Sequence, residues 1–222
     1  MRLIIFDFDG TLVNSQDMII TAYQNAAQIQ RLPKPEKSVI LKTIGLSLKE
    51  SIEKIFPDLS EEEVKHLKHH FQTSFLNIRD SDSVQSLSHV YPGAIPFLEN
   101  LSKCSKNVLA IASGKAFAGL RFDLNLHKLG RFFSNIQSSD SHPSKPDPSM
   151  LRACLSETGF KPSNAIMVGD TAYDIQMANS VSIKSIAVTW GYHSLRLLEK
   201  EKPDFIANSF EEVEKFIYQA ID

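Results

Sequence analysis

The sequence predicts an α/β fold, a doubly wound parallel sheet of Rossmann-like type with an inserted α-helical domain. Short continuous apolar runs recur along the chain, as expected for strands buried on both faces of a sheet. Helical patterns separate these runs, and alternating strands and helices favour a parallel sheet with helices on both sides. The expected strands are residues 3–6, 108–112, 165–168 and 185–188, with a weaker one at 204–206.

The inserted domain is predicted from the long interval between the first two strands. About 100 residues are too many for a single crossover connection. Serine followed three residues later by glutamate marks two helix starts within the interval, Ser47–Glu50 and Ser60–Glu63. Tyr91-Pro92-Gly93 predicts a turn at which the chain re-enters the sheet. We therefore expect a catalytic α/β core at residues 1–13 and 91–222, and a helical domain at residues 14–90.

The composition excludes several classes of partner. The net charge of -2 provides no basic field for nucleic acid or an anionic membrane. No apolar stretch approaches the roughly 20 residues that span a bilayer, and the first apolar run is too short for a signal peptide. The two cysteines, Cys104 and Cys154, have no metal-ligand spacing. We expect a cytoplasmic protein with reduced thiols, either a monomer or a homodimer, that binds neither nucleic acid nor membrane.

Polar residues that suit phosphate chemistry follow several of the predicted strands. Ligands of open parallel sheets bind beyond the carboxyl ends of the strands, so these residues are expected to converge. A loop with three prolines adds one lysine. The candidate residues are Asp7, Asp9 and Thr11 after the first strand, Ser113 and Gly114 after the second, Lys145 in the loop, and Asp170 with Asp174 after the third. Carboxylates, a hydroxyl and a lysine at one rim are what magnesium-assisted phosphoryl transfer requires.

Each candidate also has a simpler interpretation. Asp7 and Asp9 could open a calcium loop, but Thr11, Leu12 and Met18 occupy the positions where that loop needs Asp or Asn, Gly and Glu. Two carboxylates at a buried strand end are costly without a cation, which argues against a plain turn. Ser113-Gly114 and Asp170 with Asp174 could be helix caps, and Lys145 could be solvated. His66, His69 and His70 have a spacing that suits a metal but also suits an exposed helix face.

Four stretches in this order resemble the haloacid dehalogenase superfamily of hydrolases, and the resemblance covers essentially the whole chain. The stretches are DFDGTLVNS (residues 7–15), SGK (113–115), SKPDP (144–148) and GDTAYD (169–174). The helical insert is similar to the small cap domain of that family. The runs IGLSL (44–48) and VTWGYH (188–193) resemble the branch that includes phosphoglycolate phosphatases.

The resemblance implies a role for each candidate residue. Asp7 matches the nucleophile that forms an aspartyl-phosphate, and Asp9 matches the general acid and base. The implied Mg²⁺ ligands are Asp7, Asp170 and the backbone carbonyl of Asp9, with Asp174 outside the ligand shell or an occasional ligand. Thr11, Ser113, Gly114 and Lys145 match the phosphate-binding group, and Thr11 is further expected to orient Asp9. An acid at the position of Asp9 favours phosphate esters over halide substrates.

The implied activity is Mg²⁺-dependent hydrolysis of a small phosphorylated metabolite. Phosphoglycolate is a candidate substrate by branch resemblance alone, and its carboxylate would need a cation; Lys42, Lys49 and Lys115 are candidates. A sugar phosphomutase is an alternative, in which the aspartyl-phosphate donates to a sugar hydroxyl instead of water. A non-hydrolytic phospho-accepting switch is a second alternative, although a switch needs no leaving-group acid.

Overall fold

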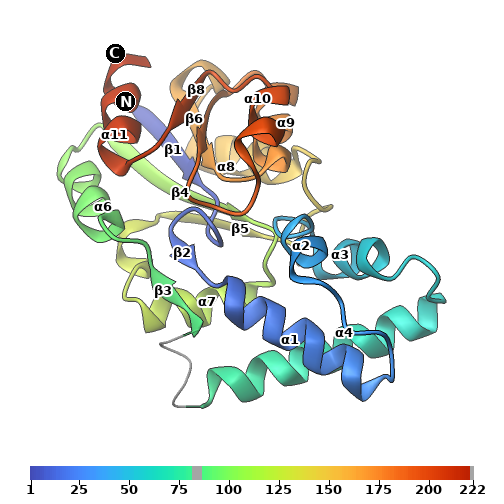
Figure 1. Ribbon diagram of the computed structural model, residues 1–222. Helices are drawn as coiled ribbons and strands as arrows, with labels where there is room; N and C mark the ends of the chain where they lie inside the picture. Colours follow the sequence, from blue (N-terminus) through green and yellow to red (C-terminus); the bar gives the residue numbers. More distant parts are fainter. Residues whose placement is uncertain (82–86, 221–222) are drawn as a thin grey trace.

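The computed structural model describes residues 1–81 and 87–220, whose strands form a six-stranded parallel sheet in the order β5-β4-β1-β6-β7-β8 (Figure 1). The strands are β1 (Arg2–Phe6), β4 (Asn107–Ser113), β5 (Asn135–Ser138), β6 (Ala165–Gly169), β7 (Lys184–Val188) and β8 (Phe205–Ala207). Every pairing between neighbouring strands is parallel. The predicted α/β fold with a doubly wound sheet is therefore confirmed.

Helices cover both faces of this sheet, and the central strand shows why. Ile4 and Phe6 of β1 point to one face, and Leu3 and Ile5 point to the other, because side chains alternate along a strand. The helices on the first face are α6 (Ala94–Lys103), α7 (Phe117–Leu126) and α11 (Phe210–Ala220). Those on the second face are α8 (Ser149–Thr158) and α9 (Ala172–Ser180). The remaining elements of the core are η1 (Gly130–Phe132), η2 (Pro162–Asn164) and α10 (Leu195–Lys200).

The edge strand β5 is absent from the strands expected from sequence. Its four residues, Asn-Ile-Gln-Ser, include a single apolar side chain, so no apolar run marks it. Its three polar side chains are buried, and two of them bind the same carboxylate on α8. Asn135 and Gln137 donate to Glu157 Oε2 over 2.6 and 3.0 Å. Paired polar groups thus replace the hydrophobic pattern at this edge.

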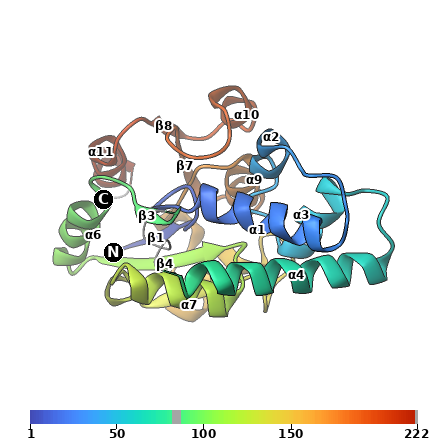
Figure 2. The same ribbon diagram turned by 60° about the horizontal axis from the view of Figure 1, so that its bottom comes forward.

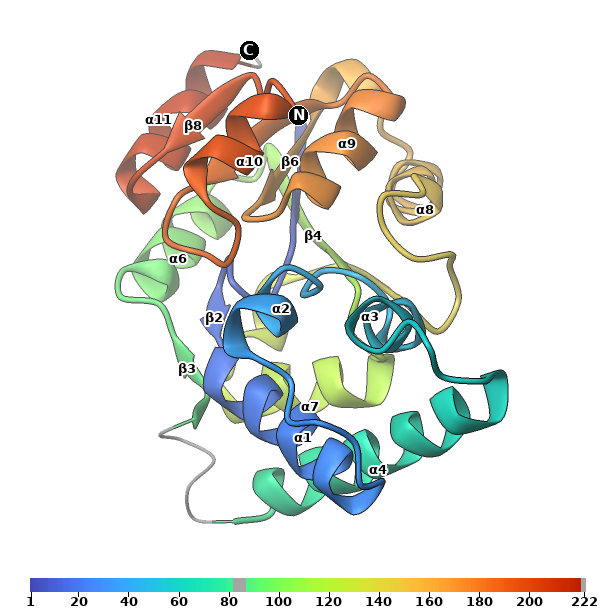
Figure 3. The ribbon, with the colours of Figure 1, turned by 45° about the vertical axis from the view of Figure 1, so that its right-hand side comes forward.

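The segment at residues 15–81, within the interval between β1 and β4, is mainly helical and packs around its own apolar cluster. Figure 3 shows its helices gathered beside the sheet. Its helices are α1 (Gln16–Ile29), α2 (Lys37–Leu41), α3 (Leu48–Ile55) and α4 (Glu61–Arg79). The long helices α1 and α4 pack on each other, with the rings of Tyr23 and Phe71 at 4.5 Å. Ser60 and Glu63 form the expected capping box. The proposed domain boundaries at 14–90 stay a prediction, and residues 82–86 of that range lie outside the described residues.

A short antiparallel ribbon joins this helical layer to the sheet. It consists of β2 (Val13–Asn14) and β3 (His89–Val90), with Val13 opposite Val90 (Figure 1). The two segments that connect the helical layer to the sheet therefore lie side by side. In the described part of the chain, no helix combines the length and apolar character needed to cross a membrane.

Candidate active site

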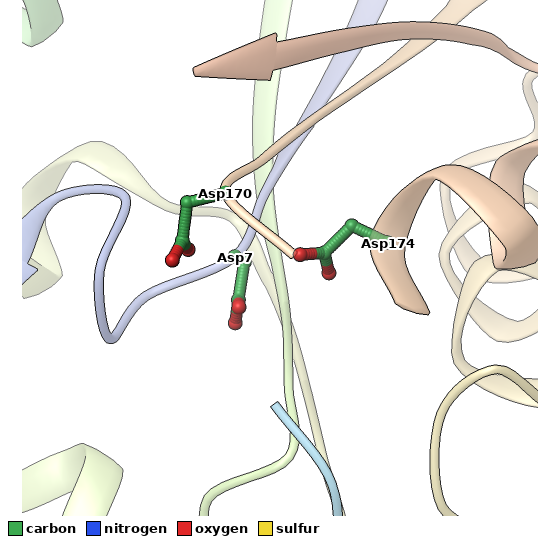
Figure 4. Close-up of side chains that lie close together, drawn as sticks. All are labelled: Asp7, Asp170 and Asp174. Atoms are coloured by element: carbon green, nitrogen blue, oxygen red, sulfur yellow. The ribbon is translucent and has the colours of Figure 1, made fainter. Parts of the chain in front are cut away.

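The candidate residues gather where the strand order reverses beside β1. The chain leaves β1 toward β4 and β5 and later returns to β6 on the opposite side of β1, which opens a crevice at the carboxyl ends. Asp7 follows β1 directly, and Asp170 follows β6 (Figure 4). Parallel pairing of β1 with β6 holds the two residues in register, since the Asp7 N–H donates to the Val168 carbonyl over 2.9 Å.

Three buried carboxylates form a cluster in this crevice. Asp7, Asp170 and Asp174 each offer an oxygen within 4.8 Å of the others, and Figure 4 shows them pointing toward a common space. Asp170 is held from two sides, by the Thr11 hydroxyl at 2.9 Å and by the Tyr192 N–H at 2.8 Å. The cluster is thus positioned by fixed donors rather than by side-chain packing alone.

Lys145 provides a positive charge in contact with the cluster. Its side chain is fully buried, and its Nζ lies 2.9 Å from Asp7 Oδ1 and 2.7 Å from Asp174 Oδ1. The other oxygen of Asp174 accepts from the backbone and side chain of Thr171, so Asp174 both caps α9 and orients the lysine. Two adjacent carboxylates raise the pKa of Lys145, which keeps the ammonium charged despite its burial.

The charges in this cluster favour a divalent cation. Three carboxylates against one lysine leave two negative charges uncompensated when all four groups are ionised. Burial is the main reason that the pKa of Asp7 is raised to about 7 and that the pKa of Asp170 is also raised. Asp7 Oδ2 is buried and has no hydrogen-bond partner among the described residues. An orphaned carboxylate oxygen among all-oxygen donors fits a hard cation such as Mg²⁺.

We expect the metal-free protein to lose stability as the pH rises from about 4 to about 7. Because the pKa of Asp7 is about 7 when folded and 3.8 ordinarily, the folded state holds a proton that the unfolded chain releases in this window. The loss amounts to at most about 4 kcal/mol, from 1.36 kcal/mol per unit of pKa.

Urea unfolding in EDTA, repeated across this pH range, measures the effect. The difference between the wild type and Asp7→Asn isolates the contribution of this carboxyl from other titrating groups. A difference that does not change with pH would contradict the raised pKa of Asp7.

Asp9 faces a cavity and is fixed by groups from two other elements. Its Oδ1 accepts from the Ser15 hydroxyl and from Lys115 Nζ, the latter at 3.0 Å. Lys115 also forms an ion pair with Asp123, a fully buried carboxylate on α7. The Asp9 side chain is therefore held at the cavity wall, beside Asp7 but outside the cluster around Lys145.

The cavity has a volume of about 410 Å³ and lies between the sheet and the helical layer. Asp7, Asp9, Ser113 and Gly114 line one end of it. The loop at residues 43–47 closes against this end, because a Cβ on Gly114 would lie 2.2 Å from the Gly45 carbonyl oxygen. The Ser47 N–H also donates to the Ser144 hydroxyl over 2.8 Å, next to Lys145. Only glycine at position 114 permits this approach of the two loops.

The structure places all the candidate residues at one site, but some contacts differ from those expected. Thr11 donates to Asp170 and not to Asp9; the hydroxyl that contacts Asp9 is that of Ser15. Asp174, expected mainly outside the ligand shell, lies within the acidic cluster. Of the histidines considered for metal binding, His66 and His69 are exposed, and the cluster of possible metal ligands among the described residues contains none of the three.

Sequence reasoning missed the support that the segment after β7 gives to the site. Besides the Tyr192 N–H, the Trp190 indole donates to the Thr11 carbonyl over 3.1 Å. His193 Nδ1 accepts from the Ala172 N–H at the start of α9, and its Nε2 lies 3.3 Å from the Lys42 carbonyl of the helical layer. Their position after a strand end was the signal available, but it does not distinguish a supporting loop from a surface turn.

Comparison with known proteins agrees with this geometry. Residues 4–188 match a family model described as haloacid dehalogenase-like hydrolase. The chain is 33% identical over 214 residues to a probable phosphatase, IndB, of Dickeya dadantii, covering 95% of this chain and 91% of that one. It is 29% identical to the pyrophosphatase PpaX of Bacillus cereus, covering 96% and 94%. A crystal structure of a predicted phosphoglycolate phosphatase from Haemophilus somnus superposes with a TM-score of 0.83 at 26% identity, covering 97% of each chain.

Proposed function

Because the chain belongs to the haloacid dehalogenase-like hydrolase family, we propose that it is a Mg²⁺-dependent phosphatase that hydrolyses a small phosphate monoester. The observation that carries the proposal is that Asp7 and Asp9 both line one end of a cavity, next to a buried acidic cluster. The pair supplies a nucleophile and a proton donor to the same substrate, which a structural cluster does not require.

We assign the metal to the acidic cluster. Asp7 and Asp170 would hold Mg²⁺ together with the Asp9 carbonyl, and Asp174 is near enough to contribute. Bound there, the ion would neutralise charge on the phosphoryl oxygens. Thr11 and the Tyr192 N–H keep Asp170 turned toward the cluster.

In the first step, a carboxylate oxygen of Asp7 attacks phosphorus, and the bond from phosphorus to the ester oxygen breaks. Asp9 gives its proton to the departing alcohol, leaving an aspartyl-phosphate on Asp7. The Ser113 hydroxyl, the Gly114 N–H and the Lys145 ammonium stabilise the charge on the transferring group. The Phe8 N–H, which donates to Asp7 Oδ1 over 2.7 Å, helps to hold the nucleophile in place.

In the second step, water attacks the phosphorus of the aspartyl-phosphate. Asp9 accepts the proton of that water, inorganic phosphate leaves, and Asp7 is restored as a carboxylate. Ser15 and Lys115 keep Asp9 in one orientation through both steps. The helical layer at residues 14–90 would act as a cap that excludes bulk water, with the β2–β3 ribbon as its attachment.

The expected result is Mg²⁺-dependent release of phosphate from para-nitrophenyl phosphate, with activity lost in EDTA. Inorganic phosphate measured over many turnovers separates hydrolysis from the alternatives. A switch would take up phosphate once without continued release, and a mutase would form a bisphosphate with a sugar phosphate. Absence of metal-dependent turnover would reject the phosphatase assignment.

A further inference from the structure

The cavity above Asp7 and Asp9 is larger than a phosphoryl group needs. Its 410 Å³ extends away from the catalytic aspartates and is lined there by side chains of α1 and α4, the two long helices of the insert. Figure 2 shows these two helices side by side. A cavity of about 150 Å³ is enough to bind benzene. The space therefore accommodates a phosphoryl group together with a cyclic leaving group.

The wall that meets this leaving group is aromatic. The rings of Tyr23 and Phe71 lie 4.5 Å apart, and those of Phe71 and Phe75 lie 5.9 Å apart with an angle of 25° between their planes. The lining is completed on this side mainly by aliphatic side chains: Ile19, Ile44, Leu46, Leu48 and Leu76. Stacked rings beside branched aliphatic groups favour a flat apolar ligand.

The charged side chains on the described lining are already engaged or exposed. Lys115 forms ion pairs with Asp9 and Asp123, and its Nζ also lies 5.1 Å from the centre of the Phe75 ring. Arg79 forms an ion pair with Asp80 at 2.8 Å, and His69 is exposed.

The other two lysines considered as partners for a substrate carboxylate do not place a cation in the cavity. Lys42 and Lys49 are exposed, and neither lies on the lining of the cavity. A carboxylate or a second phosphate in the cavity would thus lose its water without gaining a free buried cation from the described residues.

We propose that the substrate is the phosphate monoester of an uncharged alcohol that carries a flat ring, seated against Tyr23, Phe71 and Phe75. This inference rests on the proposed phosphatase function and specifies its substrate class. Phosphoglycolate and pyrophosphate, which relatives of this chain are named for, have anionic leaving groups and do not match the lining. Ser51, Thr43 and Gln72 also line the cavity and offer hydrogen bonds that would orient the ring substituents.

Phosphonates test the proposal without turnover, because their phosphorus–carbon bond is not hydrolysed. Calorimetric Kd values in Mg²⁺ would be compared for benzylphosphonate, methylphosphonate and phosphonoacetate, the last standing for phosphoglycolate. We expect benzylphosphonate to bind about 10- to 100-fold more tightly than methylphosphonate, since burial of the ring adds to a shared phosphonate contact. We expect phosphonoacetate to bind no more tightly than methylphosphonate.

A substitution in the aromatic wall provides the second readout. Phe71→Leu should reduce the preference for benzylphosphonate by about threefold to tenfold and leave methylphosphonate binding unchanged. The matched control is Phe205→Leu, which removes a ring stacked on Phe216 at 4.8 Å, on the far edge of the sheet. The control should change neither Kd.

The outcomes separate this inference from the proposed function. Tighter binding of phosphonoacetate than of benzylphosphonate, in a protein that hydrolyses para-nitrophenyl phosphate, would overturn the ring-bearing substrate alone. Equal Kd values for all three phosphonates would also overturn the ring-bearing substrate. Equal effects of Phe71→Leu and Phe205→Leu on the Kd of benzylphosphonate would overturn it as well. Absence of turnover with a retained preference for benzylphosphonate would reject the phosphatase function and keep the ligand class.

Discussion

Asp7→Asn is expected to lower kcat by at least about 10⁴-fold, because an amide oxygen cannot form the aspartyl-phosphate. The substitution keeps the size of the side chain and the acceptor for the Phe8 N–H. The fold should therefore survive, and the metal-free protein should be no less stable near pH 7, since a costly buried charge has been removed. Steady-state kinetics with para-nitrophenyl phosphate and thermal unfolding measure the two effects.

Asp17→Asn is the matched control for this prediction. Asp17 lies on α1, exposed, and its contact with Lys37 at 3.7 Å is a surface ion pair. The same chemical change there should leave kcat within about twofold, because exposed pairs contribute little. A kcat for Asp7→Asn within about tenfold of the wild type would show that Asp7 is not the nucleophile.

Lys145→Met is expected to cost about 3–5 kcal/mol of unfolding free energy in EDTA near neutral pH. The lysine is the buried partner of both Asp7 and Asp174, and breaking a buried ion pair by removing one member leaves uncompensated charge. Methionine has a similar length and carries no charge. Urea unfolding followed by circular dichroism measures the loss.

The control for this prediction is Lys49→Met. Lys49 is exposed and forms an ion pair with Glu53 one helical turn away, at 3.5 Å. Its loss should cost less than about 0.5 kcal/mol. If the two lysine variants are equally stable, then the charges of the acidic cluster are not balanced by Lys145 as the structure indicates.

Much of the fold follows from the sequence because the central strands are buried on both faces. Burial on both faces gives β1, β4 and β6 uninterrupted apolar runs, and each expected range lies within the observed strand. β5 has no such run, because its buried side chains are polar, and those of Asn135 and Gln137 donate hydrogen bonds to Glu157. The pattern of apolar residues along the chain cannot reveal a strand whose buried side chains are polar.

The candidate site could be located from sequence for a similar reason: its residues follow strand ends, and parallel strands present those ends together. The contacts within the site depend on rotamers and on distant segments. Thr11 reaches Asp170 from 159 positions away, and the Tyr192 N–H reaches it from 22 positions away. Asp123 contacts Lys115 from a neighbouring helix, with no motif to mark it. Spacing along the chain does not fix such pairings.

The aspartyl-phosphate itself provides the most direct test of the mechanism. The enzyme would be quenched in acid during turnover of a ³²P-labelled monoester and digested, and the labelled peptide would be identified by mass spectrometry. We predict an acid-stable, hydroxylamine-labile phosphoryl group on Asp7, absent from Asp7→Asn. Label on Ser113 or another residue, or continued phosphate release with no labelled peptide at any quench time, would contradict the account.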